Sequence, residues 1–125
     1  MSRELVVKKC LKCGAIVKVL EECKCPCGIE CCGEEMKTIV PNSIDAAVEK
    51  HVPVYEVKDG KIIARVNHVM EEEHYIEWIL IVYDEKEIWT YFKPGDEPVV
   101  SAEYVPGSTI YAYCNKHSLW KKDVE

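Results

Sequence analysis

The chain has 125 residues, of which 48% are hydrophobic and 30% charged, with a formal net charge of -6. This length holds one ordinary domain, or a modest domain with a very small one, and excludes two full-sized domains. No apolar run approaches the roughly 20 residues of a membrane span, and the acidic balance disfavours nucleic acid, whose binding depends on basic patches.

The N-terminal segment, residues 1–37, holds seven of the eight cysteines. Its first residues, MSRELVVKKC, lack the apolar stretch of a secretory signal, so we expect a cytoplasmic protein with reduced thiols. Clustered reduced thiols bind metal more often than they form disulfides, although a disulfide framework is an alternative. A segment this small cannot bury enough apolar surface to fold alone, and a bound metal would supply the missing stability.

Within this segment, Cys10 and Cys13 form a C-x-x-C pair, whose spacing lets two thiolates converge on one ion. Tetrahedral sulfur coordination needs two more cysteines and fits zinc or iron. The spacing alone does not decide between the five candidates, which are Cys23, Cys25, Cys27, Cys31 and Cys32. The adjacent cysteines Cys31 and Cys32, which precede Gly33, are hard to explain by packing alone. A zinc ribbon that only holds the fold is the structural alternative.

Residues 38–50, TIVPNSIDAAVEK, are expected to form a connector with a Pro-Asn turn and one short helical turn. The rest of the chain has the pattern of β-strands, rich in β-branched and aromatic residues and separated by turn signals. The expected strands are VPVYEV at 52–57, KIIARVN at 61–67, YIEWILIVY at 75–83, IWTYF at 88–92 and STIYAYC at 108–114. Short strands at this spacing predict an all-β sandwich.

All four histidines and the last cysteine lie in this second part, at the edges of expected strands, where loops from one end of a sandwich can converge. They are His51, His68, His74, Cys114 and His117. Four imidazoles with one thiolate are too many ligands for tetrahedral zinc but suit an iron that keeps one position open. A thiolate ligand pushes electron density toward whatever binds opposite it, so this is a site for reducing an oxygen species.

Two charged residues precede the first histidine. By composition alone, Glu49 and Lys50 are ordinary surface charges. Beside an open metal position, however, the lysine would attract an anionic substrate and the carboxylate could cap the empty site.

Together these residues resemble the desulfoferrodoxin family, the two-iron class of superoxide reductase, over nearly the whole chain. That family's N-terminal pattern, a C-x-x-C pair followed by a vicinal Cys-Cys-Gly, maps onto Cys10, Cys13, Cys31 and Cys32. The segments EKHVP, HVMEEEHYIEW and CNKH match its active-site segments. The cysteines of CKCPC depart from the pattern: one of them could replace a ligand, or they could bind adventitious metal or be free thiols.

The resemblance implies a desulforedoxin-like domain at 1–37 with an Fe(Cys)4 centre, a linker at 38–50, and an immunoglobulin-like sandwich at 51–125. In the sandwich, it implies an iron with four equatorial histidines and an axial Cys114 thiolate. Superoxide would bind the vacant sixth position of the ferrous ion, take one electron, be protonated and leave as hydrogen peroxide. Lys50 matches the family's superoxide-attracting lysine and Glu49 the glutamate that ligates the oxidised iron.

The resemblance also implies partners. An external donor, typically a rubredoxin, would restore the ferrous state, and the chain would form a homodimer. Two other kinds of protein are the alternatives: a non-enzymatic two-iron electron carrier or redox or iron sensor, and a structural zinc protein. Neither needs a Glu-Lys pair beside a metal ligand, so the EKHVP segment disfavours both.

Overall fold

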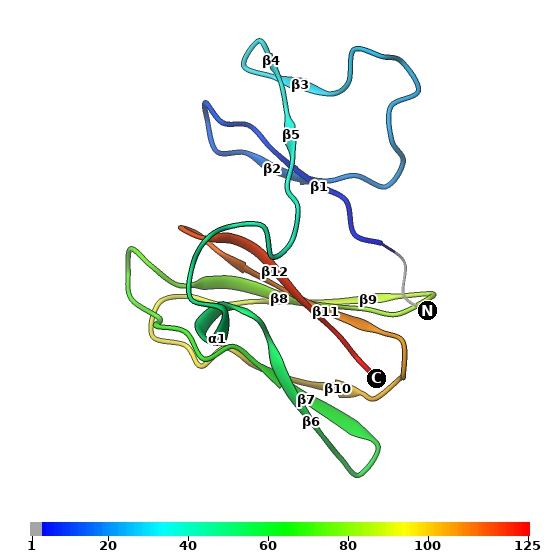
Figure 1. Cartoon of the computed structure of the whole chain (residues 1–125), viewed down its shortest axis with the longest axis vertical. Coiled ribbons are helices and arrows are strands. Elements are labelled where there is room, and N and C mark those ends of the chain that lie inside the picture. Colours follow the sequence, from blue (N-terminus) through cyan, green and yellow to red (C-terminus); the bar gives the residue numbers. More distant parts are fainter. Residues whose placement is uncertain (1–3) are drawn as a thin grey trace. The chain divides into compact units, whose positions relative to one another are not determined.

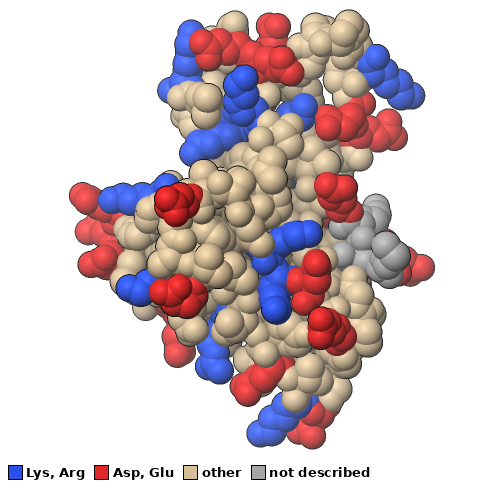
Figure 2. Space-filling view, viewed as in Figure 1, with Lys and Arg blue, Asp and Glu red and all other residues tan. Residues whose placement is uncertain are grey.

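The structure is a computed structural model that describes residues 4–125, and it is built almost entirely of β-strands (Figure 1). The described chain divides into two compact units, Glu4–Val40 and Pro41–Glu125. Within residues 4–125, no helix has the length and apolar character needed to cross a bilayer. Figure 2 shows acidic and basic side chains interspersed over the face in view.

The N-terminal unit is a small three-stranded sheet with a separate short hairpin. Antiparallel pairing gives the sheet the order β2-β1-β5, and β3 pairs with β4. The strands are β1 (Val7–Lys9), β2 (Ile16–Lys18), β3 (Glu30–Cys31), β4 (Glu34–Glu35) and β5 (Lys37–Thr38). Because β5 pairs with β1, Thr38 is part of this unit rather than of the expected connector, and the contacts extend the unit to Val40.

The hairpin turn that joins β3 to β4 has an unusual backbone. Cys32 and Gly33 both have left-handed φ angles, of 55° and 78°. Glycine adopts this conformation at no steric cost, whereas a residue with a Cβ rarely does. The turn therefore needs a glycine at its second left-handed position, and it presents two consecutive cysteines at the tip of a short hairpin.

The C-terminal unit is a sandwich of two antiparallel sheets, as the sequence predicts. One sheet has the order β10-β7-β6 and the other the order β12-β11-β8-β9, and a four-residue helix α1 (Val48–His51) precedes the first strand. The strands are β6 (Val54–Lys58), β7 (Lys61–Arg65), β8 (Ile76–Val82), β9 (Glu87–Tyr91), β10 (Val99–Glu103), β11 (Thr109–Cys114) and β12 (Ser118–Asp123).

All five strands predicted in this unit are present, with ends shifted by one or two residues, and the short helical turn lies at the end of the segment where it was expected. Two strands were not predicted. In β10, VVSAE, alternate side chains are exposed, and β12, SLWKKD, has a charged second half. Each forms because a neighbouring strand, β7 or β11, offers a complete row of backbone partners.

The core lies between the two sheets and is made of side chains from both. It includes Ile62 and Ala64 of β7 and Ile79, Ile81 and Ile110 of the larger sheet, each at most 1% exposed. Because the core fixes the strands, it also fixes the loops that leave them at each end of the sandwich.

A buried tyrosine ties the two sheets together at one corner. Tyr83, directly after β8, donates a hydrogen bond from its hydroxyl to the carbonyl of Glu103, the last residue of β10, at 2.6 Å. Burial is the main cause that raises the pKa of this phenol, and the nearby carboxylate adds to the effect.

Candidate metal centres

Four histidines and one cysteine meet at one end of the sandwich, and the strand pairing explains why. The end of β7 lies beside the start of β6, just after α1, because Arg65 pairs with Val54. The end of β11 lies beside the start of β8, because Cys114 pairs with Ile76 after an irregularity in the register. The residues that leave these strand ends are His51 from α1, His68 after β7, His74 before β8, Cys114 at the end of β11 and His117 before β12.

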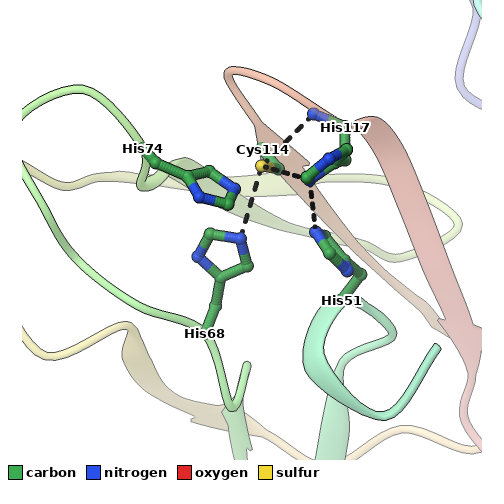
Figure 3. A group of neighbouring side chains, drawn as sticks. All are labelled: His51, His68, His74, Cys114 and His117. Carbon is green, nitrogen blue, oxygen red and sulfur yellow. Dashed lines mark hydrogen bonds between the residues drawn. The ribbon is translucent and has the colours of Figure 1, made fainter. Parts of the chain in front are cut away.

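The side chains of these five residues, here called the histidine–cysteine group, point toward one another (Figure 3). His51 Nε2 lies 3.1 Å from His117 Nδ1, and Cys114 Sγ lies 3.4 Å from His68 Nε2. One donor atom from each of the five falls within 4.8 Å of all the others. Ligands that lie about 2.1–2.3 Å from a shared ion are at most roughly 4.5 Å apart, so the group has close to the dimensions of a filled metal site.

Backbone contacts determine which nitrogen of two histidines faces the centre. The Nδ1–H of His51 donates to the carbonyl of Ala47 at 2.7 Å, and the Nδ1–H of His68 donates to the carbonyl of Val69. A carbonyl only accepts, so in each neutral ring the proton sits on Nδ1 and Nε2 presents a lone pair to the group. Such backbone partners orient histidine ligands in metal sites.

His74 provides the test of whether a metal fits. Its Nε2 is buried and has no hydrogen-bond partner, an arrangement that costs free energy unless something else satisfies the atom. Burial is the main cause that lowers the pKa of both His74 and His68, which favours the neutral rings that bind metals. An ion among the five donors would satisfy the orphaned nitrogen, so the residues present fit a metal.

The sulfur of Cys114 belongs to a fully buried residue at the end of β11. Burial raises the pKa of this thiol, whereas peptide N–H groups of Lys116 and His117 lower it. One of these, the His117 N–H, donates to Sγ at 3.3 Å. A bound cation would shift the balance to the thiolate, which is the metal-binding form.

The two predicted charged residues precede His51 on α1, and both side chains are exposed. Lys50 and His68 line the same open surface pocket, of about 440 Å³, together with Arg65 and Glu97. A cation thus stands at a pocket whose wall includes a residue of the histidine–cysteine group. Glu49 lies outside that group.

Two further residues support the histidine–cysteine group, and the sequence interpretation did not assign them a role. Asn115 accepts the N–H of Tyr75 at 3.0 Å and donates to the carbonyl of Glu73 at 2.9 Å, so it clamps the residues on both sides of His74. Trp120 donates to the carbonyl of His117 at 2.8 Å and stacks on His51, with ring centroids 4.9 Å apart. The asparagine in CNKH was a signal that could have identified the first of them.

A second group of donors lies in the N-terminal unit. The structure brings together the four cysteines that the resemblance selected, here called the four-cysteine group: Cys10, Cys13, Cys31 and Cys32. The sulfurs of Cys13 and Cys31 are 3.7 Å apart and those of Cys31 and Cys32 are 3.9 Å apart. Two sulfurs that share a tetrahedral ion at about 2.3 Å lie roughly 3.8 Å apart, so this group also fits a metal.

Backbone N–H groups favour the thiolate form of one member of this group, Cys10. The peptide N–H of Cys13 donates to the sulfur of Cys10 at 3.5 Å and is the main cause that lowers the pKa of that thiol to about 7. The cysteines of CKCPC lie outside the four-cysteine group. Cys23, Cys25 and Cys27 are free and exposed, on the loop between β2 and β3. Because the four-cysteine group is complete without them, the structure disfavours the possibility that one of the three replaces a ligand.

A comparison with known protein families matches residues 43–123 to the desulfoferrodoxin profile. The chain belongs to the desulfoferrodoxin family. The desulfoferrodoxin of Syntrophotalea carbinolica is 39% identical to it over 98% of this chain and 99% of the relative. A desulfoferrodoxin homologue of Archaeoglobus fulgidus is 40% identical over 97% of this chain and 98% of the relative. Desulfoferrodoxin relatives thus align over both units.

Comparison with solved structures shows that the fold of this chain is similar to that of superoxide reductases. A superoxide reductase from Treponema pallidum matches with a TM-score of 0.69 and 26% identity, over 97% of this chain and all of the other. A one-iron superoxide reductase from Giardia intestinalis matches with a TM-score of 0.51 and 27% identity, over 59% of this chain and 95% of the other.

Proposed function

We propose that this desulfoferrodoxin is a superoxide reductase, which reduces superoxide by one electron to hydrogen peroxide. The histidine–cysteine group would hold the catalytic iron and the four-cysteine group a second iron, giving two iron ions per chain. The observation that carries the proposal is the convergence of five donors, one of them an orphaned buried nitrogen, in a chain similar over 97% of its length to a superoxide reductase.

The donor set favours iron over the commoner zinc. Structural zinc takes four ligands and catalytic zinc takes three, whereas five donors from four imidazoles and a thiolate exceed both. Imidazole and thiolate both suit iron. The bound iron would supply the single electron and a coordination position for superoxide, which zinc, having no redox chemistry, cannot do.

The chain's own residues would bring the substrate in and keep the site ready. Superoxide is an anion, and Lys50, exposed at the pocket that His68 also lines, raises its local concentration by electrostatic attraction. Glu49, the neighbouring carboxylate, is the residue proposed to occupy the open position after oxidation. Protons for the peroxide come from water, which reaches the site through the open pocket.

The proposed protein has two domains joined by a linker, and it works with an electron donor and a second copy of itself. The desulforedoxin-like domain is proposed at residues 1–37, extended to Val40 by the contacts of β5. The linker and start of the active-site loop then run to residue 50, and the reductase domain is 51–125. An external one-electron donor such as a rubredoxin re-reduces the iron, and the chain forms a homodimer in the cytoplasm. The small core of the N-terminal unit supports a stabilising metal there, since a unit of this size rarely folds without one.

The stoichiometry of superoxide consumption tests the proposal. The iron-loaded protein is reduced without oxygen, given a limiting pulse of superoxide, and assayed for peroxide and dioxygen. A reductase yields one peroxide per superoxide and takes one electron from the protein, with no dioxygen. A dismutase yields half as much peroxide together with dioxygen. An electron carrier would consume no superoxide beyond the buffer rate, and its spectrum would not respond to azide or cyanide.

A further inference from the structure

The loop between β2 and β3 carries a second, separate group of sulfurs that the proposed function does not use. It consists of Cys23, Cys25 and Cys27, here called the CxCxC loop. The sulfur of Cys25 lies 2.8 Å from that of Cys23 and 2.6 Å from that of Cys27. All three side chains are exposed to solvent, so small reactants can reach the sulfurs.

The spacing of these sulfurs distinguishes the CxCxC loop from a metal site. In the four-cysteine group the sulfurs are 3.7 and 3.9 Å apart, as expected around a shared ion. In the CxCxC loop both distances are about 1 Å shorter than a shared ion requires. A sulfur–sulfur bond is about 2.05 Å long, so either pair needs to approach by less than about 1 Å to bond directly.

We propose that the CxCxC loop is a peroxide-reactive thiol site, in which Cys25 is the nucleophile and either Cys23 or Cys27 closes a disulfide with it. The Cys25 thiolate attacks one oxygen of hydrogen peroxide, the O–O bond breaks, and hydroxide leaves as the sulfur becomes a sulfenic acid. The neighbouring thiol then attacks that sulfur and water leaves. In sum, two thiols and one peroxide give one disulfide and two waters.

The central position of Cys25 suits it to this role. Contacts with the side chains of Cys23 and then Cys27 are the main causes that lower the pKa of the Cys25 thiol to about 7. The contact with Cys25 in turn raises the pKa of Cys27. At neutral pH a large share of Cys25 is therefore thiolate while Cys27 keeps its proton, which is the pairing of an attacking and a resolving cysteine.

The proposed function would supply the hydrogen peroxide with which the CxCxC loop reacts. The thiol-site proposal depends on superoxide reduction only for this supply. Hydrogen peroxide would be the product of superoxide reduction on the same chain. Each closure of the disulfide would consume one peroxide, and a dithiol reductant would have to reopen it. The chemistry itself is tested with added peroxide, so it can succeed or fail whether or not the protein reduces superoxide.

The test treats the full-length, iron-loaded protein with one equivalent of hydrogen peroxide, alkylates the remaining thiols, and maps the peptides after digestion with trypsin. Lys24 lies between Cys23 and Cys25. Cleavage after it separates the two possible disulfides: a bond from Cys25 to Cys23 links two peptides, whereas one to Cys27 closes within the peptide 25–37, which becomes lighter by two hydrogen atoms. Because that peptide also holds Cys31 and Cys32, its fragmentation spectrum locates the bond. We expect one or both bonds, reopened by dithiothreitol.

Three variants assign the roles. Cys25→Ser should form no disulfide in the loop, and its thiol oxidation should slow at least about tenfold, since ordinary thiols are only a few per cent ionised at pH 7. Cys27→Ser should still close with Cys23. The double variant Cys23→Ser/Cys27→Ser should stop at a sulfenic acid on Cys25 that dimedone labels. Superoxide reduction should be unchanged in Cys25→Ser, because the loop lies outside both metal groups.

Four results would overturn the proposal. The first is full alkylation of all three loop thiols after peroxide treatment. The second is disulfide formation at the wild-type rate in Cys25→Ser. The third is oxidation confined to the four-cysteine group. The fourth is a metal ion that is bound in addition to the two proposed irons and is lost in Cys25→Ser, which would make the loop a metal site.

Discussion

At the scale of single residues, neighbouring backbone groups determine which atoms of the histidine–cysteine group can bind a metal. The carbonyls of Ala47 and Val69 hold the ring protons of His51 and His68 on Nδ1, so that in both rings Nε2 presents its lone pair to the group. The buried Nε2 of His74 has no protein partner. These assignments follow from which atoms can accept a hydrogen bond, and they require no information about a bound ion.

Replacing Cys114 tests the thiolate. In Cys114→Ala the four imidazoles remain but the only sulfur donor of the group is lost, so electron donation toward a bound oxygen species is lost with it. We expect the variant to produce no peroxide from superoxide, measured by the pulse assay, while the four-cysteine group keeps its iron spectrum. Full activity in this variant would exclude a mechanism that depends on the thiolate.

Replacing Lys50 tests electrostatic attraction. Lys50→Ala should slow superoxide capture by roughly tenfold at low salt and weaken the dependence of the rate on ionic strength, because attraction between exposed charges is screened by salt. Lys58→Ala is the matched control. It removes the same charge from the last residue of β6, at the end of that strand away from α1 (Figure 1). Equal effects of the two variants would mean that net charge, not the position of Lys50, controls the rate.

At the scale of elements, one turn holds the site together. Residues 114–117 connect β11 to β12 and supply two donors to the histidine–cysteine group, while Asn115 in the same turn grips the loop that carries His74. A turn that both supplies ligands and clamps another ligand loop couples metal binding to the pairing of β8 with β11.

Asn115→Ala should therefore loosen His74 without removing any donor. Loss of two hydrogen bonds costs about 1 kcal/mol each, and the loop from Glu73 to Tyr75 loses its tie to the turn. We expect iron to dissociate from the histidine–cysteine group about 10–100-fold more readily in competition with a chelator. Asn115→Asp is the control variant: it keeps the acceptor for Tyr75 but not the donor to Glu73, and should fall between the wild type and Asn115→Ala.

At the scale of the whole molecule, the two units differ in what stabilises them. Within residues 4–40 the buried apolar side chains are Leu5, Val7, Cys10 and Met36. The sandwich has a continuous core from both of its sheets. A unit with so little buried apolar surface depends on another source of stability, and the four-cysteine group offers metal binding as that source.

Metal removal should therefore unfold the two units unequally. In the protein stripped of metal under reducing conditions, we expect residues 4–40 to lose their amide protection while the strands of the sandwich keep theirs. Hydrogen exchange read by mass spectrometry would separate the two. With iron still supplied, Cys13→Ala should also lose amide protection in residues 4–40 alone. Superoxide consumption by the chemically reduced variant should remain intact. Cooperative unfolding of both units would contradict this division.

The sequence by itself determined the class of fold and indicated which residues are candidate metal ligands. Runs rich in β-branched and aromatic residues, separated by turn signals, predicted five of the seven sandwich strands, because such side chains pack well on the pleated surfaces of a sheet. The same pattern missed β10 and β12, because their side chains are too exposed or too charged to look like those of a buried strand. These two strands form through backbone pairing with β7 and β11. Residue type together with placement at the edges of expected strands predicted the five donors, because loops from one end of a sandwich can bring imidazole and thiolate side chains to one point.

Only the tertiary structure decided which cysteines lie together and which side-chain atoms face each metal group. Spacing along the chain left five cysteines competing for two places, because a loop of 17 residues between Cys13 and Cys31 can bring many atoms near an ion. The hairpin of β3 and β4 brings Cys31 and Cys32 to the first pair and leaves the CxCxC loop apart, with its sulfurs facing one another. Which ring nitrogen faces the centre, and the clamp made by Asn115, likewise follow from contacts between segments that only the fold brings together.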